Sequence, residues 1–499
     1  MIPFKRALFL FAAILCGFMA CRQSDEFTTD AGAKLAFSSD TLRFDTVFTS
    51  LGSATRSFKI FNRNSKSIKI SKISLANKTK AVFNLNIDGV SGRSFTDVEI
   101  PAQDSIYVFA KVTINPNDPL SISPFVIAED LNFETNGNTQ RVVLEAFGQN
   151  ANYIPSRFSS GKESILDCGG GEVVWNDPKP YVIYGYLGVA NGTLRLPAGT
   201  RIHVHGGLVR AADTTLQRDG VLYITTNGRL IADGTLEKPV IFEGDRLEKE
   251  FEDVPGQWRG VYFVRGSRNS TLNFAIIRNA QLGIYMDSST TVALKNTKIY
   301  NTESSGLRTI HAAVTAENCL FYANGGNSVQ IEYGGTYDFK YCTMTSYGQS
   351  PAFSATNWVC VETNALGQCT KGTDFPLNST LTNCVIYGSR EDQIGLSDLT
   401  PTTANDFSAS FKNCVVRVKD LLTPKGGFPN FLTANCVDCI NAPTTAKLFR
   451  KPSSGDFHLD TLSVAEQKAF PIPAISTDLD RKNRDLQKPD IGCFEFYPR

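Results

Sequence analysis

An excess of charge of one sign is what the sequence most clearly lacks. Its 499 residues carry 50 Lys and Arg against 49 Asp and Glu, which gives a formal net charge of +1. Such a balance supplies no electrostatic field for nucleic acid or for an anionic membrane surface. We therefore expect no nucleic-acid partner, and any membrane association must rest on another feature of the chain.

Long apolar runs are also missing after the first 20 residues. No later stretch approaches the roughly 18 consecutive apolar residues of a membrane-spanning helix. The content of 42% hydrophobic and 20% charged residues fits a folded protein, and 39 Gly, 34 Phe and 16 Tyr favour turn-rich β structure. Disorder, collagen and coiled coil are thereby excluded as the main architecture.

The N-terminal segment has the organisation of a signal peptide. In residues 1–20, Lys5 and Arg6 precede an apolar run that ends at the small residue Ala20. The four residues that end at Cys21, Phe-Met-Ala-Cys, resemble the lipobox of bacterial lipoproteins. The resemblance implies a lipid on Cys21, whereas ordinary secretory cleavage near Ala20 is the alternative.

Residues 22–27 resemble the acidic patch that routes some Gram-negative lipoproteins to the outer face of the outer membrane. The resemblance implies a cell-surface, outer-membrane lipoprotein with a flexible tether at residues 21–33. Its membrane contact is then the lipid anchor rather than a spanning helix.

In residues 34–149, apolar and polar residues alternate with a period of two, which is typical of half-buried antiparallel strands. About seven such strands within about 115 residues match the size of an immunoglobulin-like sandwich. The clearest run alternates at Ile106, Val108, Ala110, Val112 and Ile114.

The segments 44–48 and 58–64 resemble the opening of abnormal-spindle/Hydin-like Ig domains. That resemblance implies a spacer or docking module. No His or Cys lies between Cys21 and Cys168, so we expect neither a metal site nor a nucleophile here.

Beyond a linker at residues 150–162, similar segments recur with a period near 22 residues, which indicates a solenoid. Their second and fourth positions point to one face, so they predict two inward columns of stacked parallel strands. The leading residue, usually Asn, suits a turn where side-chain amides hydrogen-bond along the array. The segments start at Asn273, Asn296, Asn318, Tyr341, Asn383 and Asn413. The predicted columns are Phe274, Thr297, Cys319, Cys342, Cys384 and Cys414, and Ile276, Ile299, Phe321, Met344, Ile386 and Val416.

Further segments resemble right-handed parallel β-helix proteins of the pectin-lyase-like class. The opening coils are matched by residues 192–200, 202–207, 228–235, 239–242 and 255–261, and the closing segment by 456–459 and 490–495. The resemblance implies an all-β chain: an N-terminal Ig-like β-sandwich followed by a right-handed parallel β-helix solenoid at residues 163–475, then a C-terminal closing segment at 476–499.

The cysteines divide into a stacked column and two close pairs. In-register stacking places neighbouring Cβ atoms of the column about 4.8 Å apart, whereas a disulfide needs about 3.8 Å, so we expect free thiols there. Cys360 and Cys369 lie in an excursion from the repeat, and we predict a disulfide between them. Cys436 and Cys439 allow a local disulfide, two thiols, half a zinc site or a redox pair.

Aromatic and acidic residues supply the candidate binding positions. Trp175, Trp258, Trp358, Tyr333 and Tyr337 are candidates for sugar stacking, although each also suits packing in a core.

The loop 243–253 holds six carboxylates, among them Asp245 and Glu248. It is either a solvated connection or a lip that binds a cation or a partner. His203 and His205 share a strand face, but no third metal ligand is evident.

Catalytic motifs are not apparent. A lyase needs an acidic calcium site beside a basic residue, and an inverting hydrolase needs a paired-Asp motif with Gly-His-Gly. The sequence contains no such pattern, so calcium is expected only if the protein is a lyase, and no other cofactor is expected.

The sequence therefore favours a non-catalytic surface lipoprotein that binds an extended glycan or an outer-membrane protein complex through one flank of the β-helix. The alternatives are a polysaccharide lyase or glycoside hydrolase with dispersed residues, and a structural subunit of an outer-membrane assembly.

Overall fold

The computed structural model describes residues 26–48, 53, 55–78, 82–113, 125–149, 151–155, 161–210, 216–247, 249–364, 366–367, 369–398 and 406–498. The predicted signal peptide, Cys21 and Glu248 lie outside these residues. The chain forms two compact units, residues 1–150 and 151–499. In the described part of the chain, no helix has the length and apolar character that a bilayer crossing requires.

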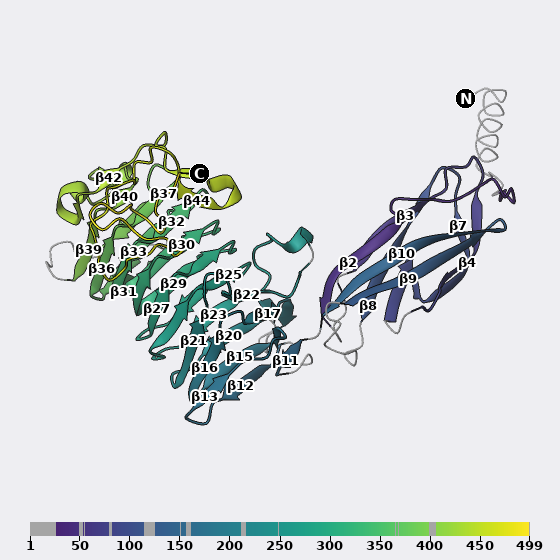
Figure 1. Ribbon diagram of the computed structural model, residues 1–499, viewed down its shortest axis with the longest axis horizontal. Helices are drawn as coiled ribbons and strands as arrows, with labels where there is room; N and C mark the ends of the chain where they lie inside the picture. Colours follow the sequence, from purple (N-terminus) through teal and green to yellow (C-terminus); the bar gives the residue numbers. More distant parts are fainter. Residues whose placement is uncertain are drawn as a thin grey trace, which may run out of the picture. The chain divides into compact units, whose positions relative to one another are not determined.

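Unit 1 is a β-sandwich of two five-stranded sheets, coloured purple to blue in Figure 1. One sheet has the order β1 (Ala36–Phe37), β3 (Arg56–Phe61), β8 (Ser105–Thr113), β5 (Val82–Ile87) and β6 (Val90–Gly92). The other has the order β2 (Thr41–Phe48), β10 (Asn138–Gln149), β9 (Phe125–Thr135), β4 (Ile68–Leu75) and β7 (Ser94–Ile100).

The alternating pattern forms the core between these sheets. On β8, Ile106, Val108, Ala110 and Val112 are buried, and residues between them are exposed. The inward residues of both sheets belong to one hydrophobic cluster, as expected when each sheet has one apolar face.

Unit 2 is a parallel β-helix whose coils contribute strands to three parallel series, here named sheets A, B and C. Figure 1 shows these strands stacked from β11 to β42. Sheet A contains β12 (Glu163–Asp167), β15 (Tyr186–Ala190), β20 (Val221–Ile224), β23 (Gly260–Phe263), β26 (Ile284–Met286), β33 (Phe353–Thr356) and β38 (Ile394–Ser397). Sheet B contains β13 (Glu172–Val174), β16 (Gly192–Pro197), β21 (Gly228–Asp233), β24 (Ser270–Asn273), β27 (Thr291–Lys295), β36 (Leu377–Thr382), β39 (Phe407–Lys412) and β41 (Cys436–Val437).

Two long strands, β29 (Leu307–Glu317) and β31 (Val329–Lys340), run through both sheets A and B. The pairing register between these two strands shifts between Ile310 and Ala312 of β29. Sheet C contains β11 (Asn152–Ile154), β14 (Tyr181–Tyr184), β17 (Arg201–His205), β22 (Val240–Gly244), β25 (Ala275–Arg278), β28 (Lys298–Tyr300), β30 (Leu320–Tyr322), β32 (Thr343–Ser346), β37 (Val385–Gly388), β40 (Val415–Val416) and β42 (Ile440–Asn441). The all-β fold class predicted from the sequence is thus confirmed.

The predicted inward columns need one correction. On sheet C, Ile299 pairs with Ile277 rather than with Ile276. The turn residue of that coil is Phe274, whose φ of 45° matches the φ of 47° at Asn296. The first coil is therefore shifted by one position, and its inward residues are Ala275 and Ile277, both buried. The remaining column positions, from Thr297 and Ile299 onward, are buried as predicted.

The turn asparagines form a ladder. Asn296 Nδ2 donates to Asn273 Oδ1 at 3.0 Å, and Asn318 Nδ2 donates to Asn296 Oδ1 at 3.2 Å. Asn296 and Asn318 have positive φ, a conformation that Asn tolerates better than most residues. The same residue thus makes the turn and joins successive coils.

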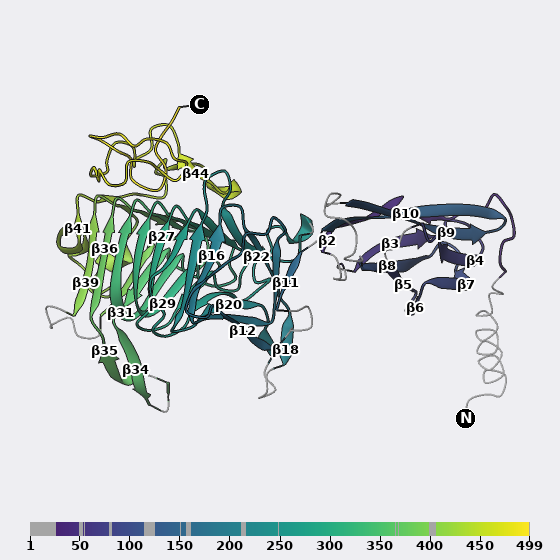
Figure 2. The same ribbon diagram turned by 60° about the horizontal axis from the view of Figure 1, so that its bottom comes forward.

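The C-terminal segment does not close the end of the β-helix. Residues 443–498 lie along the outer side of sheet C, where Phe449, Phe457 and Ile491 pack with Leu320 and Val385 in one cluster. Figure 2 shows the segment in yellow above the stacked strands.

The last coils are covered instead by two short helical turns, η3 (Asp420–Leu422) and η4 (Phe431–Asn435). Leu421 and Phe431 from these turns are buried in the main core.

Candidate functional site

Three aromatic residues predicted for sugar stacking are packing residues instead. Trp258 is completely buried, and its Nε1 donates to the carbonyl of Arg278 at 2.9 Å. Tyr337 is 2% exposed and shares a 2.9 Å hydrogen bond with Thr309. Trp175 is 5% exposed and stacks on Tyr181. Their inward orientation removes them from any glycan surface.

Trp358 and Tyr333 remain half-buried near the corner between sheets A and B. Trp358 Nε1 donates to Ser397 Oγ at 2.8 Å. Tyr333 accepts a hydrogen bond from His311 at its carbonyl and lies 6.3 Å, between ring centroids, from Phe375. These residues occupy the base of a hairpin rather than a flat stacking platform.

The acidic loop does not present its first carboxylates to solvent. The Asp245 side chain is 8% exposed and lies 2.7 Å from His205 Nδ1. Glu243 is 5% exposed and lies 2.6 Å from the guanidinium of Arg278. Asp245 therefore pairs with His205 inside the protein and does not line a cation-binding lip. Glu248 lies outside the described residues.

The two strand histidines have opposite electrostatic environments. Burial lowers the pKa of His203. Burial also acts against the charged form of His205, but the hydrogen bond and charge of Asp245 outweigh it and raise the pKa of that ring. Within the residues that the structure describes, no group of three or more His, Cys, Asp or Glu side chains is arranged to hold a metal ion. The pairs His205–Asp245 and Arg278–Glu243 hold the start of the acidic loop against sheet C.

The outer face of sheet A carries one tyrosine on each of three successive coils. Tyr223, Tyr262 and Tyr285 occupy the same register position on β20, β23 and β26, and all three are half-buried. The ring centroids of Tyr262 and Tyr285 are 5.1 Å apart. With Tyr186, which begins β15, these residues form what we call the tyrosine face.

Gly188 explains how the Tyr223 ring lies flat on this face. A Cβ atom at position 188 would be 2.5 Å from Tyr223 Cζ, so the ring occupies the space that a side chain would fill. Burial and the hydrogen bond to Glu163 raise the pKa of Tyr223. The hydroxyl is therefore protonated and acts as a hydrogen-bond donor at neutral pH.

Two arginines border the tyrosine face. The Arg259 guanidinium is 5.8 Å from the ring centroid of Tyr186 and 5.4 Å from that of Tyr262. Among the described carboxylates, none is within ion-pair distance of Arg259. Arg308 follows Tyr285 in register and pairs with Glu332 at 2.9 Å. The face thus combines ring surfaces, hydroxyls and one unpaired cation.

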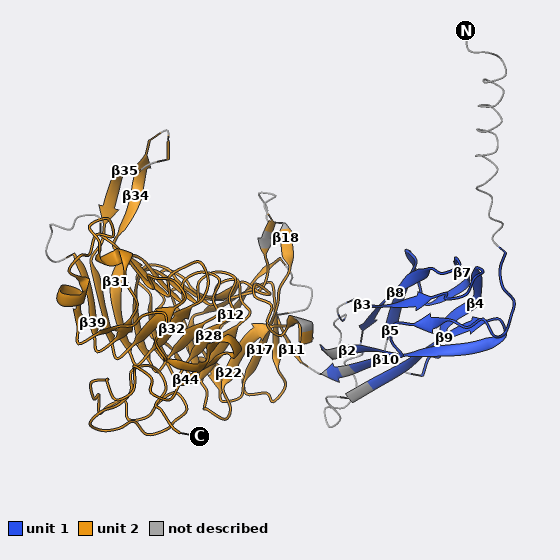
Figure 3. Cartoon of the chain, turned by 90° about the horizontal axis from the view of Figure 1, so that it is seen from above, with its two compact units in different colours: residues 1–150 blue, residues 151–499 orange. Residues whose placement is uncertain are grey.

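Two hairpins project from the β-helix on the same side (Figure 3). The first, β18 (Leu208–Arg210) and β19 (Leu216–Arg218), precedes β20 of sheet A. Its base contacts the tyrosine face, because Tyr186 Oη donates to the carbonyl of Arg218 at 3.3 Å. The second, β34 (Trp358–Thr363) and β35 (Cys369–Asp374), follows β33 of the same sheet. The tyrosine face therefore lies on the sheet that the chain enters after the first hairpin and leaves before the second.

The cysteines occupy two kinds of environment. Disulfides join Cys360 to Cys369 across the second hairpin and Cys436 to Cys439 at the last coil of sheet B. The column cysteines are buried and free: Cys319, Cys342, Cys384 and Cys414. Each of the last three contacts a carbonyl of the preceding coil through Sγ, so the thiols act as small core residues.

The tyrosine face was not found from the sequence because its residues belong to no compact motif. The signal is a tyrosine at the third position of three short segments, 221–224, 260–263 and 283–286, whose second and fourth residues are apolar. Only the alignment of coils shows that the three tyrosines are neighbours.

Comparison with known proteins agrees with this architecture. A family model described as "Right handed beta helix region" matches residues 223–344. A search of curated proteins finds no match.

Among solved structures, the catalytic domain of a GH87 alpha-1,3-glucanase in complex with nigerose is 12% identical over 74% of this chain and 81% of that chain, with a TM-score of 0.23. The catalytic unit of the thermostable GH87 alpha-1,3-glucanase from Streptomyces thermodiastaticus strain HF3-3 is 10% identical over 72% of this chain and 78% of that chain, with a TM-score of 0.19. The ASH / PapD-like domain of human CEP192 is 11% identical over 26% of this chain and 94% of that chain, with a TM-score of 0.17. The family match, together with the stacked parallel strands, identifies unit 2 as a right-handed parallel β-helix.

Proposed function

We propose that the protein is a non-catalytic cell-envelope lipoprotein that binds an extended glycan along the tyrosine face. The observation that carries the proposal is the register of Tyr223, Tyr262 and Tyr285 on three successive coils. Coils advance by about 4.8 Å, so the rings repeat on the scale of the sugar units in a polymer. A tyrosine offers an apolar ring and a polar hydroxyl, which suit the two kinds of surface on a sugar.

The lipid on Cys21 provides the membrane attachment in this proposal. It is supported by the lipobox-like sequence before Cys21 and by the acidic residues that follow. Attachment through lipid leaves the long side of the β-helix available to a polymer outside the membrane.

The glycosidase alternative needs two carboxyl groups placed on either side of the scissile bond. Glu163 and Glu332, which flank the tyrosine face, are engaged with Tyr223 and Arg308 respectively. Glu243 and Asp245 are buried beneath the acidic loop. These pairings favour binding over hydrolysis.

The proposal is tested by isothermal titration of the full chain with a panel of linear polysaccharides. We expect saturable binding to one class, and a reduction of about fivefold or more in affinity for Tyr262→Ala and for Tyr285→Ala, since stacking on an aromatic ring contributes on the order of 1 kcal/mol or more. Phe470→Ala is the matched control, because Phe470 is 62% exposed and lies on the C-terminal segment.

The same reactions are followed for new reducing ends and for unsaturated products. Binding without products supports the proposal. Turnover, or affinities that do not change in the tyrosine variants, would overturn it.

A further inference from the structure

The β-sandwich has its own exposed aromatic platform, separate from the tyrosine face. On the outer side of β8, Tyr107 is 47% exposed and Phe109 is 39% exposed. Their ring centroids are 5.6 Å apart and their planes differ by 21°, so the two rings are nearly parallel and stack on each other. The core of the sandwich lies on the other side of the sheet, which means that packing does not account for these rings.

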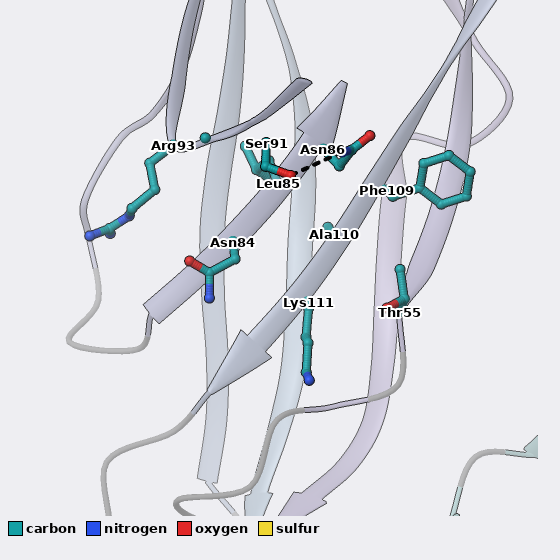
Figure 4. Close-up of a pocket in the computed structure, with 10 residues that line it drawn as sticks. Thr55, Asn84, Leu85, Asn86, Ser91, Arg93, Phe109, Ala110 and Lys111 are labelled. Atoms are coloured by element: carbon teal, nitrogen blue, oxygen red, sulfur yellow. Dashed lines mark hydrogen bonds between the residues drawn. The ribbon is translucent and has the colours of Figure 1, made fainter. Parts of the chain in front are cut away.

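A pocket of about 500 Å³ opens beside Phe109 (Figure 4). Asn84 lies opposite Lys111, and Asn86 lies opposite Phe109, in the register of β5 and β8. Arg93, just after β6, completes the rim in Figure 4. The lining thus includes two cations, two amides and one aromatic ring, together with Thr55, Ser91 and small or apolar residues.

Carboxylates are absent from the lining of this pocket, whose residues are all described. Arg93 and Lys111 are exposed and form no ion pair with any described carboxylate. A third cation, Lys59, lies 4.6 Å from the centroid of the Tyr107 ring. Arg93 and Lys111 beside the uncharged amides give the pocket a local positive field that the balanced composition of the whole chain conceals, and Lys59 adds a further cation outside the pocket lining.

We propose that this platform binds a saccharide that carries an anionic substituent, either a carboxylate or a sulfate. The apolar side of the sugar ring packs on Phe109 and Tyr107, and the anion is held by Arg93 and Lys111 with an amide donor from Asn84. Asn86 Nδ2 donates to Ser91 Oγ at 3.0 Å and has one further N–H for the ligand. Charge-assisted hydrogen bonds of this kind are stronger than neutral ones. The pocket is open to solvent beside the exposed rings, an arrangement that suits a sugar ring with a charged substituent.

The experiment is a titration of the full chain with oligogalacturonate, with a sulfated chondroitin oligosaccharide and with a neutral dextran oligosaccharide. We expect one or both anionic ligands to bind, the neutral ligand not to bind at this site, and the affinity to fall as salt is raised. Binding of only one anionic ligand shows whether the site recognises a carboxylate or a sulfate.

Variants assign the binding to this pocket. We expect Arg93→Gln with Lys111→Gln to weaken the anionic ligand by about tenfold or more, and Phe109→Ala to weaken it by a similar factor. Lys72→Gln is the matched control, since Lys72 is an exposed cation on β4 of the other sheet. Circular dichroism and thermal melting check that each variant folds.

Equal binding of the neutral ligand, or an unchanged affinity in the double variant, would overturn this inference. Its failure is distinguishable from failure of the proposed function, because Tyr262→Ala and Tyr285→Ala act on the β-helix and leave the sandwich pocket intact.

Discussion

Arg484 of the C-terminal segment donates from Nη2 to Asn318 Oδ1, 166 residues earlier in the chain, at 2.9 Å. Asn318 is the last described rung of the asparagine ladder that starts at Asn273. The guanidinium also lies 3.2 Å from Glu495 and 3.8 Å from the centroid of the Tyr341 ring. One buried cation therefore joins the C-terminal segment to the turns of the β-helix.

We predict that Arg484→Met lowers the free energy of unfolding by about 3 to 5 kcal/mol, the usual cost of leaving the partner of a buried ion pair uncompensated. The partner is Glu495, whose side chain is 8% exposed. Thermal melting and limited proteolysis of residues 443–498 measure the effect. Lys488→Gln, an exposed cation on the same segment, is the control. Equal stability of the two variants would contradict the prediction.

The C-terminal segment is also expected to respond to pH through His458. The ring lies between two aspartates, 2.6 Å from Asp456 and 2.8 Å from Asp480. The hydrogen bond to Asp480, with that to Asp456, raises the pKa of His458 above its ordinary value of 6.5. Because the folded pKa is the higher one, the stabilisation is complete below pH 6.5 and is lost as the pH rises through the folded pKa.

At low pH the dependence of stability on pH has the opposite sign. The hydrogen bond from His458 lowers the pKa of Asp480, so its contribution is lost as the pH falls through that lowered value. The protection factors of amides 456–480, which compare each exchange rate with the intrinsic rate at the same pH, should therefore be highest in mildly acidic solution and fall above neutrality. We expect His458→Gln to remove the loss of protection above pH 6.5, and a profile identical to that of the parent protein would refute this assignment.

The corrected register of sheet C predicts that substitutions at two neighbouring isoleucines have different effects on stability. Ile277 is fully buried, whereas Ile276 is half-buried on the outer side. We expect Ile277→Ala to cost about 2 to 5 kcal/mol, and Ile276→Ala at most about 1 kcal/mol. Urea denaturation of both variants gives the two values. The reverse order would restore the register expected from Asn273.

The column thiols should be chemically inert in the folded protein. Burial raises the pKa of Cys319, Cys342 and Cys384 well above 9, so the reactive thiolate is not populated at neutral pH. We expect alkylation of these residues, read peptide by peptide, only after denaturation. Ser389→Cys, at an exposed position, should react at once and serves as the positive control. Rapid labelling of Cys384 in the native protein would show that the column opens.

The lipid anchor makes a separate prediction. We expect Cys21→Ala to abolish incorporation of a fatty-acid label and to move the protein from the membrane fraction to the soluble fraction. Ser24→Ala should leave both unchanged. Membrane retention of Cys21→Ala without lipid would show that another feature provides the attachment.

The repeat pattern was sufficient to predict the fold because inward residues recur at a fixed interval along the chain. It missed the phase of the first coil, since Asn273 has the residue type of the turn while Phe274 has its conformation. The direction in which each aromatic side chain points was harder to predict from the sequence than the fold. Trp258 and Tyr262 are both aromatic residues close together in sequence, yet the first is buried and the second half-buried, because Trp258 precedes β23 in an isolated bridge to Ala280 whereas Tyr262 lies on the outer side of β23.

The C-terminal segment changes how the β-helix should come apart. In a simple solenoid each coil contacts only its neighbours, and unfolding can proceed one coil at a time from an end. Here Arg484, Cys493 and Phe470 bond to Asn318, Thr343 and Asn383 on three different coils. These coils therefore cannot separate independently, and the C-terminal half of the array should unfold as a single cooperative block.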